Sequence, residues 1–152
     1  MGSSVHPTSQ DVQRVKQATY ALLAEIGVPF KRICHIKWIN EEREYGAVWT
    51  GTTDEEGEVK IYLGCEPGAI AHEIGHGFLE SLNHNKQGAS LPHPFRWPED
   101  GEHVAEAIRF FVEQRMGTGW DKAQWRETIN ACNRDFAQFR SQVRQLVQAE
   151  CR

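Results

Sequence analysis

Residues 71–80 of the 152-residue chain read AHEIGHGFLE, so that His72 and His76 stand four positions apart. In a helix, at about 100° per residue, this spacing places the two imidazoles about 40° apart on one face. Imidazoles spaced in this way can bind one Zn²⁺ through their neutral ring nitrogens. Glu73 lies one position round the helix, where it can reach a water molecule on the metal without itself binding the metal. The stretch therefore predicts a helix that carries a metal site.

The rest of this helix is built around the motif. Pro67 suits the first turn of a helix, and we expect the helix to cover residues 67–82. Gly75 and Gly77 each cost about 1 kcal/mol relative to Ala in a helix interior, so the close approach of another backbone or of a ligand would explain them. Apolar residues gather on the side opposite the histidines: Ile70, Ile74, Phe78 and Leu82.

Upstream of this helix the periodicity changes from that of a helix to that of strands. A capping box at Thr8-x-x-Asp11 begins a helix that we expect to cover residues 9–26, with Gly27 and Pro29 ending it. From residue 30 onward apolar side chains tend to alternate, which predicts strands. We expect three of them, at residues 33–39, 45–50 and 58–63, with a turn at residues 54–57.

Downstream, a segment rich in Asn, His, Gly and Pro predicts a loop over residues 83–97. A further helix begins at Pro98 and ends at residues 117–119, which read GTG. Beyond it, apolar residues alternate at spacings of four and three, which predicts one long amphipathic helix over residues 121–149. This apolar stripe consists of Trp125, Ile129, Cys132, Phe136, Phe139, Val143 and Leu146.

The length suits one domain, which we expect to span residues 1–152 with its core at about 30–116. Seventeen Lys and Arg against 21 Asp and Glu give a net charge of −4, which argues against a nucleic-acid partner. No apolar run approaches the ~20 residues that a membrane span needs, and the N-terminus has no apolar signal-peptide core. Four scattered cysteines without a CxxC pair suit free thiols in a reducing compartment. We therefore expect a soluble, cytoplasmic protein.

A catalytic zinc site needs a third protein ligand and an open fourth position. The extended motif HExxHxxGxxH does not supply this ligand, because residues 79 and 82 are leucines. Glu102 and Glu106 stand four positions apart on the next helix, and two such carboxylates suit two roles: one binds zinc, and the other orients a ligating histidine from behind. We expect Glu102 to bind zinc and Glu106 to stand behind the histidine. Alternatives are the reverse assignment, a solvated acidic face shared with Arg109 and Glu113, or ligands from His84, His93 and His103.

The two motifs together resemble those of the gluzincin metallopeptidases. Within them the chain is most similar to compact ImmA/IrrE-type domains, where HE(I/L)GH is followed on a helix by E-x-x-A. The matching residues here are 72–76, which read HEIGH, and 102–106, which read EHVAE. In thermolysin-like gluzincins the acid four places after the ligating Glu supports a ligand from behind, which matches Glu106. ImmA/IrrE-type domains often carry Asn at that place, so Glu106 departs from their pattern.

The resemblance covers roughly residues 30–116 and implies a zincin-like α+β fold. Such a fold has a small three-stranded sheet, an HExxH helix and a Glu-bearing second helix, to which this chain adds its long C-terminal amphipathic helix. The resemblance also implies a zinc-dependent peptidase with Zn²⁺ as cofactor, metal ligands His72, His76 and Glu102, and Glu106 in support.

We therefore expect hydrolysis of peptide bonds by a zinc-activated water, with Glu73 as the general base that passes the proton to the leaving amine. The strand at residues 45–50 can hold an extended peptide by strand addition, and Tyr45, His84 or His93 can stabilise the oxyanion. The acidic run at residues 41–60 is either a solvated hairpin tip or a rim that favours basic substrates. The alternative function is a catalytically inactive zincin-like module that binds a protein partner. A peptidase regulated by such a partner combines the two; no nucleic acid or membrane is expected as a partner.

Overall fold

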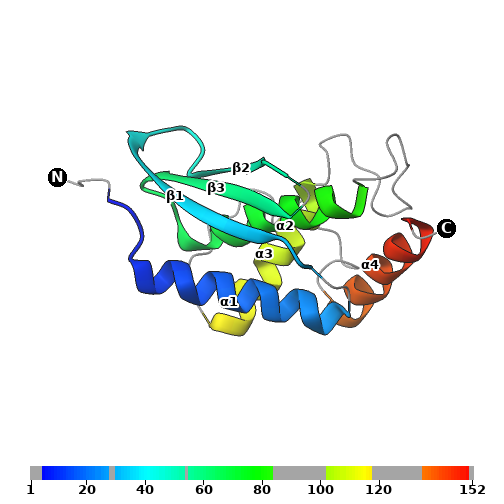
Figure 1. Ribbon diagram of the computed structural model, residues 1–152. Helices are drawn as coiled ribbons and strands as arrows, with labels where there is room; N and C mark the ends of the chain where they lie inside the picture. Colours follow the sequence, from blue (N-terminus) through cyan, green and yellow to red (C-terminus); the bar gives the residue numbers. More distant parts are fainter. Residues whose placement is uncertain (1–4, 28–29, 54, 84–101, 118–134, 151–152) are drawn as a thin grey trace.

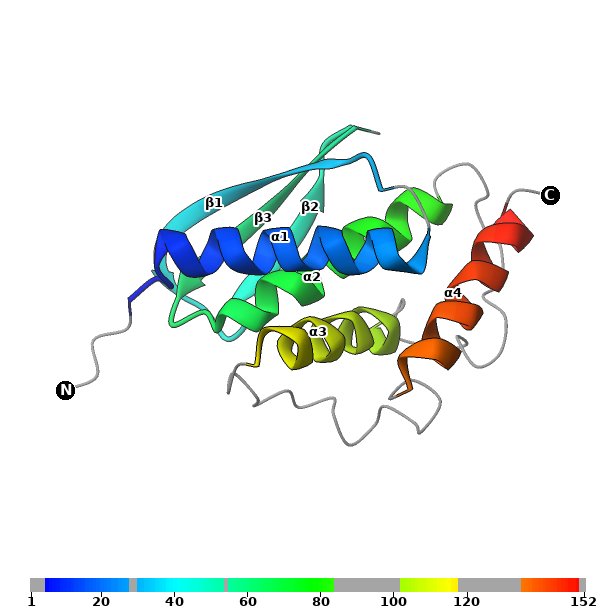
Figure 2. The ribbon, with the colours of Figure 1, turned by 90° about the horizontal axis from the view of Figure 1, so that it is seen from below.

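The computed structural model of the chain describes residues 5–27, 30–53, 55–83, 102–117 and 135–150. These residues form an α+β arrangement of four helices and a mixed three-stranded sheet. The helices lie on one side of the sheet: α1 and α2 are next to it, α3 lies beyond α2, and α4 crosses one end (Figures 1 and 2). The elements are α1 (Ser9–Ile26), β1 (Ile33–Glu42), β2 (Ala47–Gly51), β3 (Glu56–Leu63), α2 (Pro67–Asn83), α3 (Glu102–Met116) and α4 (Phe136–Glu150).

Helix α1 begins and ends where the sequence predicts. The Thr8 hydroxyl accepts a hydrogen bond from the Asp11 backbone N–H at 3.0 Å, which satisfies one of the free donors of the first turn. At the other end, Gly27 adopts the left-handed conformation with φ of 88°, where glycine is unstrained. One side of the helix faces the core, since these residues, spaced by three or four positions, are all buried: Val12, Val15, Thr19, Leu22 and Ile26.

All three predicted strands are present, with somewhat different bounds. Strand β3 lies in the centre, parallel to β1 and antiparallel to β2, so β2 is an edge strand of the sheet. Along β3, Val59 and Ile61 are fully buried while their neighbours Glu58, Lys60 and Tyr62 are partly exposed, so one face of the sheet covers the core. The turn expected at residues 54–57 ends earlier, because Glu56 and Gly57 already belong to β3. Residues of β1 pair with them across the sheet, and this long-range pairing extends the strand.

Helix α3 packs tightly against α2, and the contact explains one of the two glycines in the motif. A Cβ atom at Gly75 would lie only 3.1 Å from the Cα atom of Ala105, so the two backbones approach closely at this point. The face of α3 that could have been a solvated acidic face is instead buried. Glu106, Arg109 and Glu113 are only 1%, 8% and 3% exposed. These three polar side chains of α3 therefore lie inside the molecule.

Helix α4 is shorter than the helix predicted over residues 121–149. Asp135 lies outside the helix, and its carboxylate accepts a hydrogen bond from the Ala137 backbone N–H at 2.9 Å. An aspartate in this position caps a helix N-terminus, because it satisfies donors that have no partner within the helix. The helix therefore begins at Phe136, and Phe139 and Val143 of the predicted stripe are fully buried. Residues 118–134 lie outside the described part of the chain, as does the loop predicted over residues 83–97 apart from its first residue.

The two cysteines among the described residues are buried free thiols, as the sequence predicts for them. Burial raises the pKa of Cys65 to about 12 and raises the pKa of Cys34 as well. Because the thiolate is the reactive form, we expect both to resist alkylation at pH 8 in the folded protein and to react once it is unfolded. Mass-spectrometric mapping of iodoacetamide adducts with and without denaturant measures this. Rapid modification of Cys65 in the native protein would contradict it.

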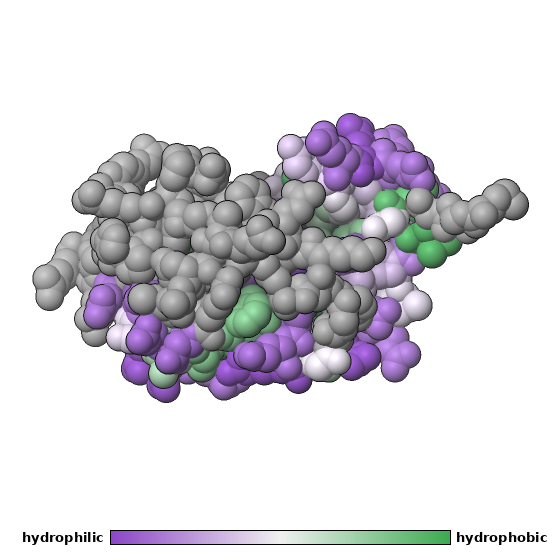
Figure 3. All heavy atoms as spheres, turned by 180° about the vertical axis from the view of Figure 1, so that it is seen from behind, coloured by the Kyte–Doolittle hydropathy of each residue, from purple (hydrophilic) through white to green (hydrophobic). Residues whose placement is uncertain are grey.

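The described surface is mostly polar. Among the described residues, no helix is both long and apolar enough to cross a membrane. Strongly hydrophilic residues gather over the end of the sheet where β1 leads into β2, as the view from behind shows (Figure 3). Glu41 and Glu42 at the end of β1 and Glu44 in the connection to β2 are exposed, which fits both a solvated hairpin tip and an acidic rim.

Candidate metal centre

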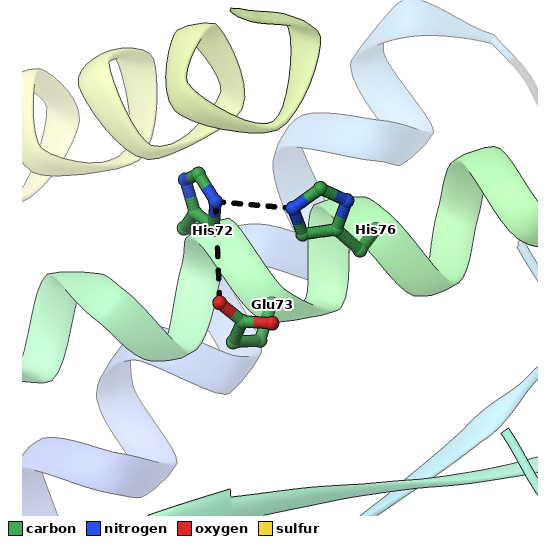
Figure 4. A group of neighbouring side chains, drawn as sticks. All are labelled: His72, Glu73 and His76. Atoms are coloured by element: carbon green, nitrogen blue, oxygen red, sulfur yellow. Dashed lines mark hydrogen bonds and ion pairs between the residues drawn. The ribbon is translucent and has the colours of Figure 1, made fainter. Parts of the chain in front are cut away.

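Helix α2 presents three polar side chains of the motif together (Figure 4). The Nε2 atoms of His72 and His76 lie 3.1 Å apart, and a Glu73 carboxylate oxygen lies 3.9 Å from His72 Nε2. One ligand atom from each of the three residues lies within 4.8 Å of the others, so this group can hold a metal ion. His72 is buried, and the other two side chains are partly buried. The spacing in the sequence therefore produces the convergence that it predicts.

The spacing of the two imidazoles fits a divalent metal. Two nitrogen ligands, each about 2.0–2.1 Å from Zn²⁺ in a tetrahedral site, lie roughly 3.3–3.4 Å apart. The observed distance of 3.1 Å between His72 Nε2 and His76 Nε2 differs from this by a few tenths of an ångström. Small side-chain rotations would therefore suffice to bring both nitrogens to one ion.

Glu106 of α3 lies directly behind His72. Its Oε2 atom is 2.7 Å from His72 Nδ1, and both side chains are at least nine-tenths buried. When Glu106 is ionised it can only accept a hydrogen bond, and Nδ1 then carries the proton and donates it. In the neutral ring, Nε2 then keeps its lone pair and faces His76. The contact fixes both the tautomer and the orientation of the ring, which is what a ligating histidine needs.

A second feature of this carboxylate also fits a cation. The other oxygen, Glu106 Oε1, is buried and has no hydrogen-bond partner among the described residues. A buried carboxylate oxygen without a donor is costly in free energy, and a nearby positive charge lowers that cost. The chemistry of the donor set, two imidazoles with carboxylates around them, is that of known zinc sites.

One buried cation, Arg109, lies further along the same face of α3. Its guanidinium donates to Glu113 Oε1 at 2.7 Å and to Glu66 Oε2 at 2.8 Å. Burial would lower the pKa of Arg109, but the hydrogen bond and charge of Glu113, together with the charge of Glu106, raise it. The arginine therefore stays charged and ties α3 to the residue that precedes α2. Among the described residues, three carboxylates act on this guanidinium, those of Glu66, Glu106 and Glu113.

The carboxylate of Glu73 is held by the sheet. The backbone N–H of Trp49 in β2 donates to Glu73 Oε1 at 2.9 Å, while Oε2 faces His72. The two oxygens therefore have separate partners, one on the edge strand and one beside the imidazoles. Sequence reasoning did not find this role of Trp49. The residue in the sequence that indicates the approach of Trp49 is Gly77, because a Cβ atom there would lie 2.6 Å from the Trp49 indole.

The remaining candidate residues lie partly inside and partly outside the described part of the chain. Glu102 is the first residue of α3, one turn before Glu106 on the same side of the helix, but its side chain lies outside the described part. The same holds for the side chain of His103, while His84 and His93 lie entirely outside the described residues. Tyr45 is 69% exposed in the connection between β1 and β2. The described residues thus bring together His72, Glu73, His76 and Glu106.

Comparison of the chain with protein-family models, with curated proteins and with solved structures finds no match.

Proposed function

We propose that the chain is a zinc-dependent metallopeptidase, with His72, His76 and Glu102 holding the metal and Glu106 supporting His72. The observation that carries the proposal is the convergence of His72 Nε2 and His76 Nε2, 3.1 Å apart, beside the carboxylate of Glu73. The buried contact between Glu106 and His72 Nδ1 supports it, because that contact prepares the ring to bind a cation. Glu102 precedes Glu106 by four residues on α3, and this spacing of one helical turn supports it as the third ligand.

The residues divide the chemistry between them. When bound, Zn²⁺ supplies an acidified water and polarises the scissile carbonyl. Glu73 accepts a proton from the water at Oε2, the oxygen on the side of the imidazoles, and passes it to the leaving amine. Oε1 stays on the Trp49 N–H throughout, which keeps the second oxygen directed at the site.

The substrate is a peptide or a protein, and the edge strand β2 is suited to hold it. Among the described residues, the edge of β2 that does not pair with β3 runs past Glu73, which holds the Trp49 N–H. An extended peptide that adds to the neighbouring main-chain groups of this edge would pass beside the imidazoles. Main-chain hydrogen bonds would supply the affinity without demanding a particular sequence. The zincin-like resemblance of the motif and its surroundings agrees with this arrangement.

The purified full chain is expected to bind one Zn²⁺ per molecule, because two histidines and a carboxylate form a three-ligand open site. Elemental analysis after mild dialysis measures the stoichiometry, and a fluorescent casein derivative measures hydrolysis. Removal of zinc by a chelator should abolish hydrolysis, and added zinc should restore it. A stoichiometry near zero that added zinc does not restore would overturn the metal site. One bound zinc without any hydrolysis would support the inactive binding module instead.

A further inference from the structure

The backbone N–H of Trp49 points away from its own sheet. Along an antiparallel ladder, hydrogen-bonded pairs alternate with pairs that are not hydrogen-bonded. Gly46 and Tyr62 form a hydrogen-bonded pair, and Trp49 lies three residues further along the edge strand, opposite Val59. Its N–H therefore faces the free edge of β2, where it donates to Glu73 Oε1. This donor fixes one oxygen of Glu73 without contacting either histidine.

The indole of Trp49 is wedged between the sheet and helix α2. The spaces that a Cβ atom would occupy at Gly57 of β3 and at Gly77 of α2 are both taken by the ring. Any larger residue at either position would displace the indole. The two glycines thus make room for one side chain, from opposite sides, and the ring fills the gap between strand and helix.

The ion pair of Glu80 and Arg32 holds the polar edge of the indole. Its Nε1–H donates to Glu80 Oε2 at 3.0 Å, and Glu80 Oε1 accepts from the buried guanidinium of Arg32 at 2.9 Å. The guanidinium carbon of Arg32 also lies 5.6 Å from the centre of the indole ring, in a cation–π contact. The ring is therefore held by its faces and by its polar edge.

These contacts fall on one side of α2. Glu73, Gly77 and Glu80 follow the i, i+4, i+7 spacing of a helix face, and all three meet Trp49. The main chain of Trp49 binds the first, and its side chain packs on the second and donates to the third. The indole thereby holds the main chain of β2 at a set distance from the helix that carries Glu73.

We propose that Trp49 is a positioning residue: its wedged indole holds the backbone N–H that directs the Glu73 carboxylate toward the imidazoles. The inference rests on the proposed function, in which Glu73 is the general base, and adds to it a residue outside the HExxH motif. Trp49 acts through Glu73 and contacts neither His72 nor His76 in any described interaction. Loss of the wedge should therefore impair the proton transfer and leave zinc binding unchanged.

Three variants of the full chain test this. Gly77→Ala pushes on the indole while leaving every polar group in place, and Ala is a better helix former than Gly, so the helix is not weakened. Trp49→Phe removes the Nε1–H donor and leaves a smaller ring between the glycines. Trp38→Phe is the matched control, since it makes the same change at an exposed tryptophan of β1, which lies on the other side of β3 from β2.

The first measurement is amide hydrogen exchange by NMR on the metal-free protein, which needs no substrate. We expect the residue-49 amide to be protected in the wild type and in Trp38→Phe, and to exchange about tenfold faster or more in Glu73→Ala, Gly77→Ala and Trp49→Phe. Amides within the β2–β3 ladder should keep their protection. Equal protection of the Trp49 amide in wild type and Glu73→Ala would overturn the proposal.

The second measurement separates positioning from mere structural support. In the zinc-loaded protein we expect Gly77→Ala and Trp49→Phe to lower kcat about 10- to 100-fold at nearly unchanged KM, because a small misplacement of a reacting group has effects of this size. Zinc affinity should stay within about threefold of the wild type. Unchanged kcat in both variants would overturn the proposal and leave the proposed function intact. Absence of hydrolysis in the wild type would instead overturn the proposed function, while the exchange measurement would still decide whether Trp49 holds Glu73.

Discussion

Replacing Glu73 by Gln is expected to lower hydrolysis by at least about 10²–10⁴-fold while leaving zinc content and folding nearly intact. The two side chains have almost the same shape, and the Gln carbonyl oxygen can still accept the hydrogen bond that the Trp49 N–H gives to Glu73. The substitution changes the other side-chain atom, because an NH2 group replaces the oxygen Oε2. An amide group beside His72 cannot accept a proton from water, whereas the Oε2 atom of Glu73 can.

The control for this experiment is a variant that loses the metal. His72→Ala removes a nitrogen ligand and leaves the Glu106 carboxylate buried without its partner, so we expect metal-poor protein. Zinc content and rate, measured on both variants with the same casein substrate, distinguish the two kinds of loss. Full activity in Glu73→Gln would show that another group takes the proton.

Local signals in the sequence predict the elements of the fold well. The Thr8 cap and Gly27 are short-range features, and they mark the ends of α1 because a helix terminus is governed by the few residues around it. The alternation of β3 likewise predicts a half-buried strand. The parallel pairing of β1 with β3 lies beyond such signals, because it joins segments that are not neighbours in the chain.

In the candidate site, too, local spacing predicts some features, while contacts between distant segments lie beyond it. The separation of His72 and His76 is set by one helical turn, so their convergence follows from the sequence. The spacing of the acids on α3 likewise predicts a carboxylate behind a histidine, and the structure places Glu106 against His72 Nδ1. The contact between Trp49 and Glu73 joins a strand to a helix 24 residues later, and no periodicity carries that information. Only Gly77, as a glycine in a helix, indicates that something approaches there.

Apolar periodicity alone does not predict where α4 begins. The stripe from residue 125 to residue 146 has the spacing of one continuous helix, yet Asp135 lies outside the helix and caps α4. A short polar side chain that competes for backbone donors outweighs the apolar pattern at that position. A helix boundary inside a regular stripe is therefore better judged from its capping residues than from its hydrophobic residues.

The two acids of α3 are expected to respond differently when each is replaced by Ala. Glu102→Ala removes the proposed third ligand, so the zinc would be held by two histidines alone, and the protein should be metal-poor and inactive. Glu106→Ala leaves all three proposed ligands in place. It removes the acceptor that lies 2.7 Å from His72 Nδ1, and losses of this kind typically reduce metal affinity or activity by about 10–100-fold. Measurable zinc should therefore remain.

Because Glu106 is buried, its truncation leaves a cavity and an unpaired His72 donor, and Glu106→Gln provides a gentler second variant. The Gln carbonyl oxygen can still accept from Nδ1 without the negative charge, so we expect its zinc affinity to lie between those of Glu106→Ala and the wild type. Zinc titration of the metal-free variants, with circular dichroism to confirm folding, measures the order. If Glu106→Ala loses the metal while Glu102→Ala binds it normally, the two roles are exchanged. If both bind zinc as the wild type does, the third ligand is neither acid, and His84 or His93 would be tested next, since both stand between the two helices in the sequence.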